Sequence, residues 1–263
     1  MMSEQGHTSY LDLTGKRVVI TGAASGIGLA CAEAFAKQGC RLVLNDLNAA
    51  ALDTLLEQMS TRGIDTVGQD GSIALQSTVE ALFARADESF GGVDITINNA
   101  GISLNRPTMD VSLDDWTRAI DVNLTSVFLC SKASAARMLP ARSGVILNLA
   151  SMYGVVAAPE RLPYCVSKSG VVMMTKALAI EWAESGVRVN AIAPGYVKTA
   201  LVDELARAER LDLSKLVQRT PQHRLAQPDE IADLALFLAS GRAGYITGQV
   251  VGVDGGWTAY GYI

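Results

Sequence analysis

The chain has 263 residues, of which 49% are hydrophobic and 19% charged, and its formal net charge is −5. This composition can bury a sizeable core and differs from that of a disordered chain. The acidic balance and the lack of a basic stripe in the sequence argue against nucleic acid as a partner. The apolar runs are all much shorter than the roughly 18 residues that a membrane span needs.

The N-terminal stretch MMSEQGHTSYLDLTGKR contains no apolar segment of the kind found in secretory signals. We expect residues 1–12 to form a flexible tail and residues 13–263 to form a single domain. The cysteines are Cys31, Cys40, Cys130 and Cys165. They form no C-x-x-C pair and have no metal-ligand spacing with the two histidines, so no metal site is predicted. Scattered reduced thiols favour a cytoplasmic protein.

Short β-branched runs alternate with helical patterns along the rest of the chain. Strands are predicted over residues 17–21, 41–46, 65–69, 93–98, 144–150, 187–193 and 249–253. Helices are predicted over residues 26–38, 49–61, 73–89, 112–138, 161–185 and 228–239. Several strands lack polar alternation, as expected when helices cover both faces of a sheet. The pattern predicts an α/β fold: a single-domain, Rossmann-like, doubly wound parallel sheet of about seven strands flanked by helices.

One long irregular stretch lies near the end of the chain, over residues 195–227. It contains VDELARAERLDLSKLVQR, which is charged and looks helical. Long connections of this kind inside compact domains are usually functional. We therefore expect a substrate lid near residues 196–222.

A glycine-rich loop, TGAASGIG, spans residues 21–28 and joins the first predicted strand to the first predicted helix. Gly22, Gly26 and Gly28 would permit a tight turn, close approach to a pyrophosphate and close packing of helix on strand. The free N–H groups of the helix start would favour the phosphates. Taken alone, the loop fits a tight turn without a ligand equally well.

Asp46 ends the second predicted strand, 18 residues beyond Gly28. An acid at this distance from a glycine loop typically accepts hydrogen bonds from an adenosine ribose. Its charge would repel a 2′-phosphate, and neither Asn45 nor Leu47 is a cation that could hold one. The sequence therefore favours NAD over NADP, with an ordinary strand-end acid as the alternative interpretation of Asp46.

The stretch YCVSK, residues 164–168, places a phenol one helical turn from an ammonium group. A tyrosine has a reference pKa of about 10, and a nearby cation lowers that pKa. Tyr164 and Lys168 are thus either a proton-transfer pair or an ordinary helix start with a lysine that reaches to water. The pair alone does not decide between these.

With these residues in place, the chain resembles the short-chain dehydrogenases/reductases over about residues 13–257. The stretches that carry the resemblance are TGAASGIG, NNAG (98–101), DVNLTS (121–126), NLASMYG (148–154), YCVSK, RVNAIAPGYVKT (188–199) and YITGQVVGVDGG (245–256). No single stretch is decisive, but their joint order is very specific.

The resemblance implies a role for four polar residues. Tyr164 would be the catalytic acid or base, and Ser151 would hold the reacting oxygen. Lys168, together with an oxidised nicotinamide, would lower the pKa of Tyr164 and would also bind the nicotinamide ribose. Asn123 would anchor a water relay to Lys168. The alternatives are that Asn123 caps or bends its helix and that Ser151 merely ends a strand.

The resemblance also implies NAD as the cofactor and identifies residues that would bind it. These are Gly22, Ser25, Gly26, Ile27, Gly28, Asp46, Leu47, Asp70, Gly71, Asn99, Ala100, Gly101, Tyr164, Lys168, Pro194, Gly195, Val197 and Thr199. Asp70 would lie near the adenine and Thr199 near the nicotinamide carboxamide. Gly71 departs from the family, whose members often have an apolar residue after the adenine-side acid.

The substrate wall is predicted to contain Ser103, Met152, Tyr153, Arg161 and Tyr196. Arg161 would bind a carboxylate or several hydroxyls, unless it is a surface arginine paired with Glu160. We expect an oxidoreductase that transfers a hydride between NAD and a secondary alcohol or ketone, with a sugar, a polyol, or a sugar acid or hydroxy acid as substrate. The alternatives are a 3-oxoacyl-thioester reductase and a non-catalytic nucleotide-binding regulator.

The predicted helices 112–138 and 161–185 lie where this family usually pairs its subunits. The C-terminal stretch GGWTAYGYI is rich in aromatic residues, whose rings favour burial over exposure to solvent. We therefore expect a cytoplasmic homotetramer with the tail packed on a neighbour or beside the pocket. A small-molecule substrate is expected, and neither nucleic acid nor a membrane.

Overall fold

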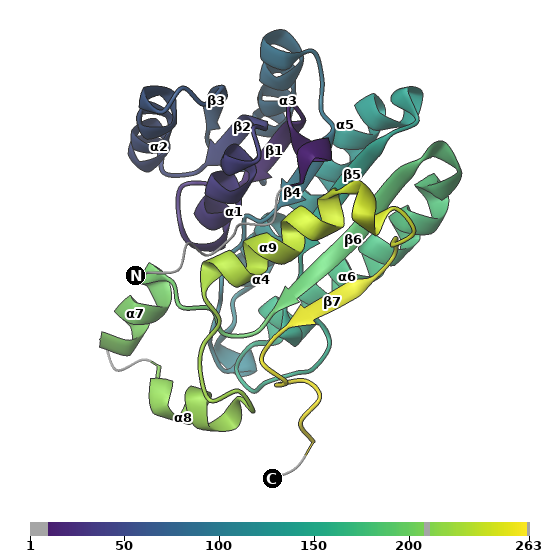
Figure 1. Ribbon diagram of the computed structural model, residues 1–263. Helices are drawn as coiled ribbons and strands as arrows, with labels where there is room; N and C mark the ends of the chain where they lie inside the picture. The colour runs from purple at the N-terminus through teal and green to yellow at the C-terminus, as the bar shows by residue number, and fades with distance from the viewer. Residues whose placement is uncertain (1–9, 208–210, 262–263) are drawn as a thin grey trace, which may run out of the picture.

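The structure is a computed structural model that describes residues 10–207 and 211–261. The strands within those residues are β1 (Arg17–Thr21), β2 (Arg41–Asp46), β3 (Thr66–Asp70), β4 (Ile95–Asn98), β5 (Gly144–Leu149), β6 (Val187–Pro194) and β7 (Val250–Val253). They form one parallel sheet in the order β3-β2-β1-β4-β5-β6-β7 (Figure 1). The predicted doubly wound parallel sheet is thereby confirmed. The strand order reverses between β1 and β4, which is where open α/β sheets bind ligands.

Helices cover both faces of the sheet. They are α1 (Gly26–Lys37), α2 (Ala49–Thr61), α3 (Gln76–Phe90), α4 (Leu113–Ile120), α5 (Ser126–Ala141), α6 (Leu162–Trp182), α7 (Ala200–Arg207), α8 (Leu213–Arg219) and α9 (Pro228–Ala239). Val18 and Ile20 of β1 pack with α1, α2 and α9 on one face. Val19 packs with α3, α5 and α6 on the other. Successive side chains of a strand point to opposite faces, so these apolar strands supply two separate cores.

Local sequence signals explain where several helices begin and end. The Asn48 side chain accepts the backbone N–H of Ala51 at the start of α2, and the Ser112 hydroxyl accepts that of Asp115 at the start of α4. Gly91 ends α3 in the left-handed conformation at φ 77°.

The helix predicted over residues 112–138 is interrupted. A π turn, Asp121–Thr125, separates α4 from α5. Asn123 lies in this turn and is fully buried, and its side chain bonds to a neighbouring loop. A π turn widens the helix locally and commonly marks a functional position. The prediction of one continuous helix was therefore wrong at Asp121–Thr125, where the Asn123 side chain bonds to the loop at Ile102.

The N-terminal tail predicted over residues 1–12 lies outside the described residues as far as residue 9. Residues 10–12 contact the domain. The backbone N–H of Tyr10 donates to the Gln38 side chain at 2.8 Å, and the Asp12 carboxylate accepts the backbone N–H of Gly241 at 2.6 Å. A short 3₁₀ turn, Leu11–Leu13, buries Leu13 in the core.

The segment predicted as a lid leaves the sheet and returns at one place. The backbone of Lys198 donates to Ala226, and Ala226 donates to Tyr196, so a short bridge ties the two ends together. Between these ends the chain forms α7 and α8, which lie away from the sheet, with α8 nearer the C-terminal segment than α7 (Figure 1). Residues 208–210 of this excursion lie outside the described residues.

The C-terminal segment packs against α8. The Arg219 guanidinium lies 4.8 Å from the ring centroid of Trp257 and 5.0 Å from that of Tyr260, and it donates to the carbonyl oxygens of both residues. Trp257 in turn meets Tyr196 edge to face, with the ring centroids 5.5 Å apart. Within a single chain, the C-terminal segment therefore packs against Tyr196, one of the residues predicted for the substrate wall. Tyr262 lies outside the described residues.

Two kinds of feature are missing from the part of the chain that the structure describes. Over residues 10–207 and 211–261, the helices are too short or too polar to cross a bilayer. In the same residues, histidine, cysteine and acidic side chains do not gather in a group that could hold a metal ion.

Candidate active site

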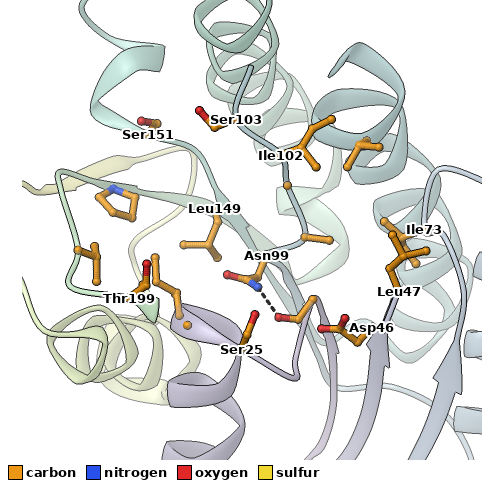
Figure 2. A pocket seen from close by; sticks show the side chains of 18 of the residues that line it. Ser25, Asp46, Leu47, Ile73, Asn99, Ile102, Ser103, Leu149, Ser151 and Thr199 are labelled. Atoms are coloured by element: carbon orange, nitrogen blue, oxygen red, sulfur yellow. Dashed lines mark hydrogen bonds between the residues drawn. The ribbon is translucent and has the colours of Figure 1, made fainter. Parts of the chain in front are cut away.

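A cavity of about 500 Å³ lies at the carboxyl ends of β1, β2, β4, β5 and β6. Figure 2 shows Asp46 and Leu47 at one end of this cavity and Ser103 and Ser151 at the other. Among the predicted site residues it is lined by Gly22, Ser25, Gly26, Ile27, Asp46, Leu47, Gly71, Asn99, Ala100, Gly101, Ser103, Ser151, Tyr164, Lys168, Pro194, Gly195, Val197 and Thr199. The fold thus brings together residues that are up to 177 positions apart, from Gly22 to Thr199.

The glycine loop is packed too tightly for side chains at two positions. A Cβ atom at Gly28 would collide with the Gly22 carbonyl oxygen. Gly22 has a φ of +62°, and a Cβ there would lie 3.0 Å from the Cα of Ala100. Gly28 does not line the cavity itself but allows α1 to approach the loop, as the predicted packing role requires.

The start of α1 is open toward the cavity. The N-cap residue Ser25 makes no side-chain cap hydrogen bond, and Gly26 and Ile27 follow it along the cavity wall. The first N–H groups of a helix have no partner within the helix, and they carry a partial positive charge. This part of the cavity therefore fits the pyrophosphate of a dinucleotide.

Asn99 clamps the glycine loop to the segment after β4. Its side-chain Nδ2 donates to the carbonyl oxygens of Thr21 and Gly22, at 2.9 Å each. The Thr21 hydroxyl accepts the backbone N–H groups of Asn99 and Ala100, at 3.0 Å each. These bonds fix the width of the cavity where β1 and β4 meet.

Asp46 marks the opposite end of the cavity from Tyr164. Its carboxylate accepts the backbone N–H of Ala24 at 2.9 Å and that of Asn48 at 2.9 Å. One lone pair on each oxygen remains, enough to accept hydroxyl groups. Among the described residues that line the cavity, Lys168 is the only cation, and it lies at the other end.

The reacting end contains two hydroxyls and a buried ammonium. Tyr164 and Lys168 lie one turn apart on α6, and the Ser151 hydroxyl acts to lower the pKa of the Tyr164 hydroxyl. The Lys168 Nζ donates to the Leu149 carbonyl oxygen at 2.7 Å and lies 5.8 Å from the ring centroid of Tyr164. This constellation can hold an oxygen atom and exchange a proton with it.

Burial shifts the pKa values of both Tyr164 and Lys168. Burial raises the pKa of the Tyr164 hydroxyl, opposed by the Ser151 hydrogen bond and by the positive charge of Arg161. Burial also lowers the pKa of Lys168 to about 8. Within the protein alone, Lys168 therefore does not lower the pKa of Tyr164 below its ordinary value, because desolvation outweighs the nearby positive charge.

Asn123 braces the reacting end from behind. Its Oδ1 accepts the backbone N–H of Ile102 at 2.8 Å, and its Nδ2 donates to the Ile102 carbonyl oxygen at 2.9 Å and to the Ser167 hydroxyl at 3.2 Å. A Cβ at Gly101 would lie 3.2 Å from Asn123 Oδ1 and 3.5 Å from Lys168 Nζ. Asn123 does not line the cavity, but it positions the loop that does.

The segment after β6 closes the cavity on one side. The backbone N–H of Gly195 donates to Val253 at 2.9 Å, and a Cβ at Gly195 would lie 2.8 Å from the Cα of Asp254. The Thr199 methyl group would lie 3.3 Å from a Cβ at Gly26. The start of the predicted lid therefore lies directly over the glycine loop.

Asp70 does not line the cavity and is exposed at the end of β3. Gly71, Ser72 and Ile73 line this end instead. The Asn45 side chain donates to the carbonyl oxygens of Gln69 and Gly71, which draws this turn toward β2. The chain turns at Gly71, at a φ of +115°, and leaves the Asp70 side chain outside.

The predicted substrate wall is only partly on the cavity surface. Ser103 lines the cavity, whereas Met152 is buried in the core. Tyr153, Arg161 and Tyr196 form a layer behind it. The two phenol oxygens are 3.1 Å apart, and the Arg161 guanidinium lies 5.2 Å from the Tyr153 ring centroid. In the described residues Arg161 forms no ion pair with Glu160.

Several cavity residues were missed by the sequence analysis. They are Asn45, Ser72, Ile73, Ile102, Val122, Leu149, Ala150 and Ala200. Leu149 and Ala150 directly precede Ser151, so their place at the end of a strand was a usable signal. Ile73 carried no such signal, because its position depends on the turn at Gly71.

Comparisons with known proteins give consistent matches. A family model described as Enoyl-(Acyl carrier protein) reductase matches residues 22–258. A D-threitol dehydrogenase of Mycolicibacterium smegmatis is 42% identical over 248 residues, which are 94% of this chain and 94% of that protein. The crystal structure of a short-chain type dehydrogenase/reductase from Mycobacterium marinum has a TM-score of 0.89 and 33% identity, covering 95% of this chain and 98% of that one.

A further relative is much longer than this chain. The uncharacterized short-chain type dehydrogenase/reductase y4vI of Sinorhizobium fredii is 40% identical over 247 residues. The match covers 92% of this chain and 44% of that protein, so this chain spans less than half of that relative's length.

The lowered pKa of Lys168 predicts a pH-dependent stability. Between the folded pKa of about 8 and the unfolded value of about 10.4, the unfolded chain binds a proton that the folded lysine has released. The free energy of unfolding of the wild type should therefore rise over this range relative to that of Lys168→Met, by about 2–3 kcal/mol in total. Denaturant unfolding at pH 7, 8, 9 and 10 measures this difference. Lys176→Met, an exposed lysine on the same helix, is the control. Parallel pH profiles for wild type and Lys168→Met would contradict the burial argument.

Proposed function

Since this chain belongs to the short-chain dehydrogenase/reductase family, we propose that it is an oxidoreductase that transfers a hydride between a nicotinamide dinucleotide and a secondary alcohol or ketone. The observation that carries the proposal is that Ser151, Tyr164 and Lys168 line the same cavity as the glycine loop and Asp46. A dinucleotide-binding end and a proton-transfer end thus share one cavity.

Each group at the reacting end has a chemical task in this proposal. In oxidation, Tyr164 takes the hydroxyl proton of the alcohol, and in reduction it gives a proton to the carbonyl oxygen. Ser151 donates a hydrogen bond to that oxygen as negative charge develops on it. The bound nicotinamide supplies the acceptor or donor of the hydride. Lys168 contributes positive charge beside the Tyr164 phenol. Asn123 holds the loop at Ile102 in place.

We propose NAD as the preferred dinucleotide. Asp46 lines the end of the cavity remote from Tyr164, and the adjacent residue Leu47 is uncharged. Two hydroxyls of an adenosine ribose would find a carboxylate there, whereas a 2′-phosphate would meet an unpaired negative charge. The open start of α1 at Ser25 would hold the pyrophosphate.

We propose a polyhydroxylated substrate: a sugar, a polyol or a sugar acid. The name of the D-threitol dehydrogenase, one of the relatives, supports a polyol. Hydroxyl groups at Ser103, Tyr153 and Tyr196 also lie beside the reacting end. The family model's description instead favours an acyl-thioester substrate. A 3-oxoacyl-thioester reductase remains the alternative, and the NADPH expected for such an enzyme is disfavoured by the charge at Asp46.

The segment near residues 196–222 is proposed as a lid over the substrate side. Thr199, in this segment, lies over Gly26 of the glycine loop.

Free thiols at all four cysteines support the proposal that the protein works in the reducing cytoplasm.

We propose a homotetramer that uses two surfaces. Apolar side chains at Leu162, Val166, Met173 and Ile180 are exposed on α6, with Met173 at 63% and Ile180 at 82%. Their spacing places them on one helix face, which a second copy would cover. The strand β7 lies at the edge of the sheet, with the fully exposed Tyr245 shortly before it. Two self-complementary surfaces of this kind generate a tetramer with dihedral symmetry.

The assignment of the proton carrier predicts the effect of removing one oxygen atom. Tyr164→Phe should lower kcat by about 10³-fold, because general acid–base catalysis contributes about 10²–10⁴-fold. Dinucleotide affinity, measured by NADH fluorescence, should change by less than about threefold. Tyr10→Phe, at a tyrosine outside the cavity, is the control and should leave both quantities unchanged. Turnover of Tyr164→Phe within tenfold of wild type would refute the assignment.

The charge at Asp46 predicts a change of cofactor preference. The double variant Asp46→Asn, Leu47→Arg should raise the ratio of kcat/KM for NADP to that for NAD by about 100-fold, because it removes a repulsion and adds a phosphate-binding cation. Asp70→Asn is the matched control, since Asp70 ends the adjacent strand but lies outside the cavity. An equal change of the ratio in the control would show that Asp46 is not the determinant.

The exposed apolar face of α6 predicts that a charged residue placed on it will disrupt the tetramer. Ile180→Arg should convert the tetramer into dimers in sedimentation velocity, because it places an unpaired cation in an apolar contact. Leu75→Arg, at an exposed leucine on α3's N-terminal side, should leave the tetramer intact. A wild-type protein that sediments as a monomer at micromolar concentration would rule out the proposed assembly.

A further inference from the structure

Five polar side chains form a continuous hydrogen-bonded series behind the reacting end, which we call the polar series. The Ser103 hydroxyl donates to Asn105 Oδ1 at 3.0 Å, and Arg161 Nη1 donates to the same oxygen at 3.0 Å. Arg161 Nη2 donates to the Tyr196 hydroxyl at 3.3 Å, and the phenol oxygens of Tyr196 and Tyr153 lie 3.1 Å apart. The series joins four segments of the chain: those after β4, β5 and β6, and the start of α6.

The positive charge at the centre of the polar series has neutral hydrogen-bond partners. Within residues 10–207 and 211–261, Arg161 forms no ion pair with a carboxylate. Its partners are an amide oxygen, a phenol oxygen and the ring of Tyr153. Arg106, in the segment after β4, is by contrast paired with Asp115 at 2.6 Å. A partly buried guanidinium that keeps only neutral partners retains a strong attraction for an anion.

The guanidinium also has unused donors. Of its five N–H groups, two make the hydrogen bonds of the polar series. The neutral contacts hold the planar group in one orientation, since the Tyr153 ring lies 5.2 Å from it and two segments bind its two terminal nitrogens. A carboxylate can be bound by the remaining donors without displacing these contacts.

Arg161 lies close to the reacting groups. It is the N-cap residue of α6, three residues before Tyr164, and its positive charge acts on the Tyr164 hydroxyl against the effect of burial. At the other side it is bonded through Asn105 to Ser103, which lines the cavity at the same end as Ser151 (Figure 2). Arg161 does not line the cavity itself but is partly exposed beside Ser103. A substrate whose reacting hydroxyl lies at Ser151 and Tyr164 would therefore have to extend past Ser103 to bring an anionic group to this charge.

We propose that Arg161, oriented by Asn105, Tyr153 and Tyr196, binds a carboxylate of the substrate, so that the enzyme acts on polyhydroxy acids in preference to the corresponding neutral polyols. The inference rests on the proposed dehydrogenase function. The hydroxyl of Ser103 is available to a neighbouring hydroxyl of the same substrate. The proposed reaction is unchanged: Tyr164 takes the hydroxyl proton, and a bound nicotinamide would accept the hydride from the same carbon.

A purely structural role for Arg161 makes a different prediction. If the guanidinium only ties the four segments together, its removal loosens the wall for every substrate and lowers the melting temperature. If it binds a carboxylate, its removal affects the acid far more than the polyol. Substrates that differ only in the presence of the carboxylate therefore separate the two roles.

The experiment compares D-gluconate with D-glucitol, and four- and five-carbon aldonates with their matched alditols. For Arg161→Gln we expect kcat/KM for the acid to fall about 10- to 100-fold, mainly through KM, as for the loss of a charge-assisted hydrogen bond. For the alditol the change should be less than about threefold. Arg161→Lys keeps the charge without the fork and should recover part of the loss. Arg106→Gln, in which the arginine already paired with Asp115 is replaced, is the matched control and should leave the acid-to-alditol ratio unchanged.

A second readout does not depend on turnover. In the presence of NADH, millimolar aldonate should raise the melting temperature of the wild type, and Arg161→Gln should abolish this rise. Equal losses for acid and alditol, or an aldonate-induced rise that persists in Arg161→Gln, would overturn the proposal while leaving the dehydrogenase function in place. A wild type that binds NADH and is stabilised by aldonate, yet oxidises no alcohol and reduces no carbonyl, would support the carboxylate site and refute the proposed function.

Discussion

The contact between the glycine loop and the segment after β4 determines where everything else in the cavity lies. Asn99 donates to two consecutive carbonyl oxygens of the loop, and Gly28 packs so closely on Gly22 that a Cβ has no room. These contacts hold the open start of α1 beside the backbone at Ala100 and Gly101. From there the chain continues to Ile102, which Asn123 binds through both its amide atoms. The reacting end is thus built outward from the strand switch point.

The cavity carries opposite charges at its two ends. The Asp46 carboxylate marks one end, and the cations of Lys168 and Arg161 lie at or behind the other. Burial works against both members of the Tyr164–Lys168 pair, since it raises the pKa of the phenol and lowers that of the amine. A buried proton carrier therefore depends on hydrogen bonds and on charge brought by ligands, more than on one neighbouring lysine.

The substrate side is assembled from segments that are distant in the sequence. Tyr153 follows β5, Arg161 begins α6 and Tyr196 follows β6, and Trp257 packs on Tyr196 from the C-terminal segment. Arg219 of α8 lies against Trp257, so the proposed lid and the tail share one aromatic contact. The C-terminal segment thus connects α8 to Tyr196 in the wall near the reacting groups.

The local pattern of residues was enough to predict the strands, most helices, the glycine loop and the Tyr164–Lys168 turn, because each of these depends on neighbours within a few positions. The position of Asp46 also followed from the sequence. It ends the strand next to β1, and the glycine loop follows directly on β1, so its backbone position beside that loop is fixed by the strand pairing. Asp70 did not follow the pattern, because the turn at Gly71 directs the chain so that Asp70 stays outside. The direction of the Tyr164 pKa shift, the π turn at Asn123 and the neutral hydrogen-bond partners of Arg161 were decided only by the tertiary structure. The burial of these side chains and their hydrogen-bond partners depend on segments that come together only after folding. The local sequence therefore does not reveal them.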